Sequence, residues 1–278
     1  MLVSPNLMPE PGENAVPAPE AVELLPQPVA AEVPRFPSWG WGDVVAVLTL
    51  TIFAVFVFSL VALGIARTFP EYHNVPLSEL ATNARVIVGA QAAAYPFVVL
   101  GIFLLVRSRS RQRFAAAIHW NWPAAGAPGF FLGGIVLAVV VESLSRFLPI
   151  PKSLPMDKYF TDASSAYLLA AFGLTLAPWL EELFFRGMLY PLLRRSFGVA
   201  ASVTLTAAAF AAIHGAQLGY AWAPILSIFV VGVAFTLTRA RTDSVAASFL
   251  MHSGYNFALF ALLWLASDHF RHLERVTG

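Results

Sequence analysis

Residues 180–187 read LEELFFRG, and this stretch places two neighbouring glutamates and an arginine among apolar residues. Glu182 and Arg186 are four residues apart, so on a helix their side chains would share one face. Ionisable groups are rare in strongly apolar helices, where they usually face a cavity or pair with another buried group. The stretch therefore predicts a buried polar site built on a helix.

The composition of the chain is that of a membrane protein. Of its 278 residues, 58% are hydrophobic and 12% are charged, whereas soluble domains are about 45–50% apolar and about 25% charged. The net charge of +1 gives no indication of nucleic-acid binding. The chain contains no cysteine, which excludes disulfides, thiolate metal sites and a cysteine nucleophile.

Apolar runs predict an all-α fold, a polytopic helical membrane protein with about seven to eight transmembrane helices. The runs are 44–66, 86–106, 127–149, 166–190, 199–218, 223–238 and 245–266. We expect four parts: a disordered tail rich in proline and glutamate at 1–42, N-terminal transmembrane helices at 43–150, a catalytic membrane core at 151–267, and a C-terminal tail at 268–278. The indoles of Trp39 and Trp41 are expected at the membrane surface.

Arginines in the loops predict the orientation in the membrane. The segment 107–113 reads RSRSRQR, and further basic residues occur two and four spans later, at Arg194, Arg195, Arg239 and Arg241. If the spans alternate, all of these lie on one side, and short basic loops are typical of the cytoplasmic side. We therefore expect an integral protein of a cytoplasmic (inner) membrane with its N-terminus in the cytoplasm.

Polar residues from three of the apolar runs are expected at one depth. They are Glu181, Glu182, Arg186, His214, His252 and Asn256, with Phe210 one turn before His214. The turn between the fourth and fifth spans is expected near Phe197. Glu181 lies about 16 residues before this turn and His214 about 17 after it, so at about 1.5 Å per residue both lie roughly 25 Å from it. The sequence therefore predicts one buried, wet pocket.

A carboxylate, two imidazoles and an amide in such a pocket are suited to water activation. A carboxylate in an apolar wall can take a proton from water. A neutral histidine can hold that water, and imidazole and amide donors can stabilise the oxyanion that forms on a carbonyl. The set predicts hydrolysis of an amide bond within the membrane.

Three other interpretations of these residues remain open. Glu181, His214 and His252 would supply enough ligands for a catalytic metal such as zinc, although the helical H-E-x-x-H spacing is absent. Intramembrane glutamate and histidine can also form a proton or ion relay in a transporter. Finally, Glu182 and Arg186 could be a structural ion pair beside ordinary core histidines.

Three motifs in this region resemble those of the CPBP family, the CAAX-processing and bacteriocin-processing intramembrane endopeptidases, also called Abi or Rce1-like. EELFFR is similar to E-E-x-x-x-R, FAAIH to F-x-x-x-H, and HSGYN to H-x-x-x-N, and together they cover about residues 165–260. The resemblance implies an all-helical membrane fold and a glutamate-type peptidase that needs no cofactor. It also implies the lipid bilayer and a peptide or membrane-protein substrate as partners. Because the family includes immunity proteins, a non-proteolytic immunity or assembly factor is the alternative function.

The resemblance implies a role for each motif residue. Glu181 would be the general base, and His214 would be the second group that holds the water. His252 and Asn256 would form the oxyanion site. The supporting positions are Glu182, Arg186 and Phe210, of which the first two would pair and shape the pocket.

Overall fold

The computed structural model describes Met1 and residues 37–275. In this part of the chain every regular element is a helix and no strand occurs. The predicted all-α fold class is confirmed, while most of the predicted 1–42 tail lies outside the described residues.

Six long α-helices form the body of the protein. They are α1 (Trp41–Ala66), α3 (Ala84–Arg109), α5 (Ala127–Ser145), α8 (Tyr190–Ile213), α9 (Trp222–Thr242) and α10 (Val245–Ala266). Shorter α-helices are α2 (Leu77–Leu80), α4 (Phe114–Ala117), α6 (Ala163–Leu174) and α7 (Leu176–Glu182). A π-helix, η3 (Leu183–Leu189), joins α7 to α8, and three short 3₁₀ helices are η1 (Pro70–Tyr72), η2 (Pro155–Tyr159) and η4 (Leu273–Arg275).

By length and apolarity, six helical segments of the described chain could cross a membrane, and one of them runs for 51 residues from Ala163 to Ile213. That segment folds back on itself at Gly198, whose φ of 74° and ψ of −176° are not helical. The rings of Phe185 and Phe210, on either side of this point, lie 5.3 Å apart between centroids. The turn expected near Phe197 is therefore present, and the fold agrees with the expected count of about seven spans.

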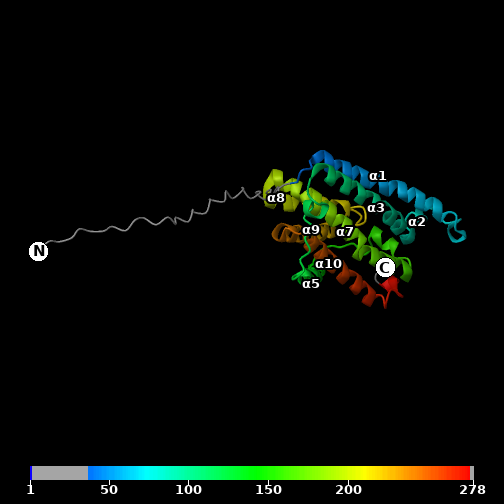
Figure 1. The fold of residues 1–278 in the computed structure, drawn as a ribbon. Coiled ribbons are helices and arrows are strands. Elements are labelled where there is room, and N and C mark those ends of the chain that lie inside the picture. The colour runs from blue at the N-terminus through cyan, green and yellow to red at the C-terminus, as the bar shows by residue number, and fades with distance from the viewer. Residues whose placement is uncertain (2–36, 276–278) are drawn as a thin grey trace. The chain divides into compact units, whose positions relative to one another are not determined.

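The helices pack in pairs that bring distant parts of the sequence together (Figure 1): α1 lies along α3, α5 along α10, and α8 against α9. The contact between α5 and α10 depends on two glycines. A methyl group on Gly134 would overlap the carbonyl oxygen of Met251, and one on Gly254 would overlap that of Phe131. Small residues allow helix backbones to approach closely in membranes, and here they fix the helix segment that carries His252.

Side chains at the helix N-termini define where three helices begin. The carboxylate of Asp162 accepts a hydrogen bond from the Ser165 amide at 2.9 Å, and Ser244 Oγ accepts from the Ala247 amide at 3.0 Å. Asn83 caps α3 in the same way. Burial raises the pKa of Asp162, but hydrogen bonds from Ser164 and Ser165 outweigh it and hold the pKa well below its usual range. The cap of α6 is therefore ionised at neutral pH.

The segments that flank the bundle pack more closely than the sequence predicted. Trp39 is 1% exposed, and its indole Nε1–H donates to the carbonyl oxygen of Met188 at 3.1 Å. Trp39 is therefore held by the protein interior, whereas Trp41 is 46% exposed; the expected place of both indoles at the membrane surface stays a prediction. At the other end, Phe270 and Leu273 of the predicted tail are buried beside Ala166.

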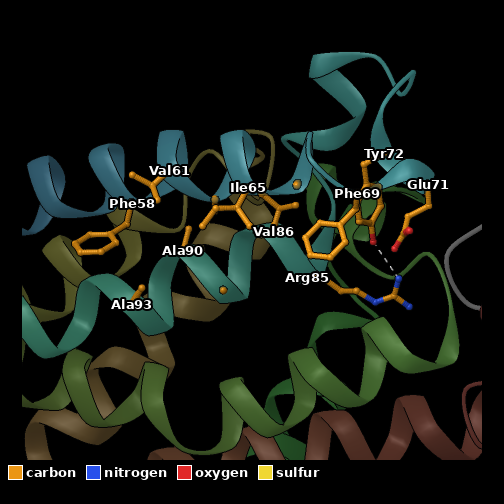
Figure 2. Close-up of a pocket in the computed structure, with 13 residues that line it drawn as sticks. Phe58, Val61, Ile65, Phe69, Glu71, Tyr72, Arg85, Val86, Ala90 and Ala93 are labelled. Carbon is orange, nitrogen blue, oxygen red and sulfur yellow. Dashed lines mark hydrogen bonds between the residues drawn. The ribbon is translucent and has the colours of Figure 1, made fainter.

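A cavity of about 560 Å³ lies between α1, α3 and the turn that contains η1 (Figure 2). Its walls are mostly apolar, with Phe58 and Ile65 on α1 facing Val86 and Ala90 on α3. Arg85 stands at one end, where its guanidinium donates to the Tyr72 hydroxyl at 3.1 Å and to Ser164 Oγ at 2.6 Å. None of the predicted site residues lines this cavity.

Candidate active site

A second cavity, of about 390 Å³, collects most of the predicted site residues. It is lined by Glu181 from α7, by Phe210 from α8 and His214 at its end, and by His252 and Asn256 from α10. The walls are completed by Gly173 of α6, by Met156 and Asp157 of η2, by apolar residues of α9 and α10, and by Phe160, Gln217 and Leu218 outside the helices. The prediction that these helices meet at one depth is confirmed, whereas the catalytic roles of the residues stay predictions.

Glu182 and Arg186 form an ion pair in the protein interior. Arg186 NH1 lies 2.8 Å from Glu182 Oε1, and both side chains are fully buried. Two other groups on α9 accept from the guanidinium: Thr236 Oγ1 at 3.3 Å and the Gly232 carbonyl oxygen at 3.1 Å. The Phe210 ring lies 4.6 Å from the guanidinium carbon, a distance that favours a cation–π interaction. Arg186 thus ties α7, α8 and α9 together.

The second partners of Glu182 come from α10. Ser248 Oγ donates to Glu182 Oε2 at 2.5 Å, and His252 Nδ1 lies 3.0 Å from Glu182 Oε1. Because a carboxylate beside an arginine accepts hydrogen bonds, Nδ1 carries the proton in this contact. The Phe235 ring stacks on His252 at 4.5 Å between centroids. Glu182 therefore fixes the orientation of the His252 ring and is itself fully engaged.

Glu181 differs from its neighbour. Its side chain is 22% exposed and lines the cavity, and the nitrogen His252 Nε2 lies 3.7 Å from Glu181 Oε2. A separation of 3.7 Å is too long for a direct hydrogen bond. The carboxylate of Glu181 consequently remains available to a molecule in the cavity.

His214 is oriented by the backbone of its own helix. Nδ1 lies 2.8 Å from the Phe210 carbonyl oxygen, so Nδ1 must be the protonated nitrogen. In the neutral ring Nε2 is then an acceptor, and no hydrogen bond occupies it among the described residues. The Phe210 ring packs against His214 at 4.8 Å between centroids, so Phe210 supports both His214 and Arg186.

Asn256 lies one turn after His252 on α10, and its amide Nδ2 donates to the Gly173 carbonyl oxygen of α6 at 2.7 Å. The amide group carries two N–H donors, so one of them remains for a ligand in the cavity. The contact also fixes the orientation of the side chain, since a carbonyl oxygen accepts from Nδ2.

A π-helix lies between the two glutamates and α8, at residues Leu183–Leu189. Each π turn admits an extra residue compared with the α-helix, and such segments often occur at functional sites. Here the amide of Tyr190 donates to the carbonyl of Phe185, five residues earlier. The segment changes the direction in which residues after Glu182 point, and it contains Arg186.

Several residues that hold the site were missed by sequence reasoning. They are Ser248, Thr236, Gly232, Phe235 and Arg239. Ser248 had a signal, because it lies four residues before His252 and so extends the face shared by His252 and Asn256. The α9 residues had none, since that run carries no motif and its contribution appears only when α9 packs against α8.

The described residues contain no group of three or more His, Asp or Glu side chains placed to hold a metal ion. Glu181, His214 and His252 share the cavity without forming such a group. The expectation that no cofactor is needed stays a prediction.

The fold has helices long and apolar enough to cross a membrane, and carboxylate, imidazole and amide side chains line one cavity between them. Residues 163–258 match the family model described as type II CAAX prenyl endopeptidase Rce1-like. This match confirms the resemblance to the CPBP family for that segment, and at the level of the family it supports a peptidase. No curated protein and no solved structure matches the chain.

Proposed function

We propose that the protein is an intramembrane endopeptidase that hydrolyses a peptide bond with water activated by Glu181. The observation that carries this proposal is the division of the two neighbouring glutamates. Glu182 is fully buried and engaged by Arg186, Ser248 and His252, whereas Glu181 lines the cavity and has no hydrogen-bond partner among the described residues. A structural ion pair needs one carboxylate, so the second is available for chemistry.

In the proposed reaction, a water molecule lies between Glu181 and His214. The free Nε2 of His214 accepts a hydrogen bond from the water. This contact orients a lone pair of the water oxygen toward the substrate carbonyl. Glu181 takes a proton from the water as the new bond between oxygen and the carbonyl carbon forms. The C–N bond of the tetrahedral intermediate then breaks, and the proton held by Glu181 passes to the leaving amine.

The negative oxygen of the tetrahedral intermediate requires donors, and α10 supplies two candidates. Asn256 offers its second Nδ2–H, and His252 offers Nε2 if that nitrogen carries a proton. Because Nδ1 of His252 already donates to Glu182, only the doubly protonated ring can serve as a donor to the oxyanion. Donors held in place before the reaction contribute more than donors that must reorient.

The position of the cavity also predicts the side from which a substrate enters. Arg239 and Arg241 lie near the beginning of α10, whereas the lining residues His252, Asn256 and Leu263 lie progressively farther along this helix. The lining residues Met156 and Asp157 precede α6, and Gln217 and Leu218 follow α8, at the opposite end of the bundle from Arg194 and Arg195. If the arginines mark the cytoplasm, the cavity opens toward the other side of the membrane.

Cysteine labelling tests this orientation, since the chain has no native cysteine. Ser196 and Ala216 are both exposed. Ser196 lies just before the turn at Gly198, and Ala216 lies just after the C-terminal end of α8, so the two mark opposite ends of the segment between them. In intact cells, a membrane-impermeant maleimide should label Ala216→Cys and should leave Ser196→Cys unlabelled until the cells are opened. The reverse pattern would place the cavity on the cytoplasmic side.

The peptidase activity is tested by comparing peptide termini in cells that express the wild type, Glu181→Gln or Glu142→Gln at equal levels. Glu142 lies on α5 and does not line the cavity, so this variant is the matched control. We expect termini that appear with the wild type and Glu142→Gln and are absent with Glu181→Gln. A general base typically contributes about 10²–10⁴-fold, enough to remove such products. A cellular phenotype that Glu181→Gln preserves, without any such termini, would instead favour an immunity or assembly role.

A further inference from the structure

The π-helix that follows the two glutamates creates a backbone carbonyl that the helix cannot satisfy. In an α-helix the Tyr190 N–H would donate to Arg186 O, four residues earlier. Here the Tyr190 N–H donates instead to Phe185 O, five residues earlier. In the π register the donor to Arg186 O would be residue 191. That residue is proline, which has no N–H. Arg186 O is therefore left without a donor from its own helix.

Arg239 of α9 supplies the missing donor. Its Nε–H donates to Arg186 O at 3.2 Å, and the side chain of Arg239 is 2% exposed. An unpaired carbonyl is costly in a protein interior, so this single contact compensates for both the π register and Pro191. The buried side chain of Arg239 thus binds the backbone carbonyl of Arg186.

Arg239 is in turn held by groups outside the candidate site. Its NH1 donates to Asp243 Oδ1 at 2.6 Å. Burial raises the pKa of Asp243, but the hydrogen bond and charge of Arg239 outweigh this and lower the pKa below its usual range. His119 Nδ1 lies 2.9 Å from the other oxygen of Asp243, and Asn121 Nδ2 donates to the Asp243 backbone carbonyl at 3.1 Å. The guanidinium therefore has a fixed direction.

We propose that Arg239 is a positioning residue, which holds the π register at Arg186 and thereby sets the directions of Glu181 and Glu182 relative to the cavity. Its part in catalysis rests on the proposed function, but its part in the backbone geometry does not. Loss of Nε–H would leave Arg186 O unpaired and would allow the segment Leu183–Leu189 to relax. Displacements of about 1 Å at a reacting group can cost about 100-fold in rate.

The carbonyl of Arg186 can be observed by itself, because Arg186–Gly187 is the one Arg–Gly pair in the sequence. Protein labelled with ¹³C at the carbonyl of arginine and with ¹⁵N in glycine gives a single directly bonded pair by NMR. We expect the Arg186 carbonyl resonance to move upfield in Arg239→Leu, which removes the donor. Asp243→Asn, which loosens the guanidinium but leaves it in place, should shift the resonance in the same direction by less. Arg241→Gln is the matched control on the exposed face of α9 and should leave the resonance unchanged.

An Arg186 carbonyl resonance that stays unchanged in both Arg239→Leu and Asp243→Asn would overturn the proposal. With a substrate in hand, Arg239→Leu should lower kcat about 100-fold at similar KM, and Arg239→Lys should restore part of kcat. If the carbonyl resonance moves and KM rises instead, Arg239 is structural and the catalytic part of the proposal is wrong. If the wild type cleaves nothing, the proposed function fails, while the carbonyl shift still decides whether Arg239 holds the π-helix.

Discussion

Two Glu–Arg pairs with the same spacing have different structures in this protein. Glu182 and Arg186 lie four residues apart and form a fully buried ion pair of 2.8 Å. Glu142 and Arg146 also lie four residues apart, at the C-terminal end of α5, yet both are exposed, and no ion pair joins them in the described structure. The spacing allows an ion pair in both places, but in the described structure an ion pair forms only between Glu182 and Arg186.

The difference lies in what surrounds each pair. Around Glu182 and Arg186, neighbouring helices supply hydrogen-bond partners for both side chains: Ser248 for the carboxylate, and Thr236 and the Gly232 carbonyl for the guanidinium. The side chains of Glu142 and Arg146 are exposed and make no hydrogen bond in the described part of the chain, and an exposed pair gains little from ordering two long side chains. A buried ion pair is thus stabilised by the network around it more than by its own spacing.

Removing the arginine of each pair should give the largest contrast. Arg186→Ala leaves Glu182 charged and buried, which costs about 3–5 kcal/mol for a buried pair. We expect a large loss of folded protein in detergent and a clear fall in the thermal unfolding temperature. Arg146→Ala should match the wild type in both measurements. Equal yields of folded protein for the two variants would show that the buried network does not depend on Arg186.

Removing a serine from each environment should give a smaller contrast. Ser248→Ala deletes the hydrogen bond to Glu182, and a hydrogen bond to a charged group contributes about 1.5–3 kcal/mol. Ser143 on α5 donates to its own helix, at Val139 O, and is exposed, so Ser143→Ala should have no measurable effect. Thermal unfolding of both variants in the same detergent is the measurement. An Ser248→Ala variant as stable as Ser143→Ala would mean that Glu182 finds another partner.

The sequence predicted the meeting of three helices because depth along a helix can be counted. Glu181 and His214 are nearly equidistant from the turn, and the structure places both on one cavity. The same counting could not distinguish Glu182–Arg186 from Glu142–Arg146, because spacing carries no information about the groups that other helices will supply.

Other features depended on contacts between segments far apart in the chain. The general preference of indoles predicts Trp39 at the membrane surface, but it carries no information about the hydrogen bond from Trp39 to Met188 across 149 residues. The π-helix has one local signal, Pro191, which explains where it ends and not why it begins. Arg239 was assigned to a cytoplasmic loop, but the end of α9 buries it against the backbone of Arg186. Each of these requires the packed structure.

The most direct test of the account compares the two adjacent glutamates in purified protein reconstituted in lipid. Glu181→Gln and Glu182→Gln would be measured for folded yield and for cleavage of a peptide identified from the cellular termini. We expect Glu181→Gln to fold like the wild type and to lose cleavage by about 10²–10⁴-fold, and Glu182→Gln to lose folded protein. Wild-type cleavage by Glu181→Gln would contradict the assignment of Glu181 as the group that activates water.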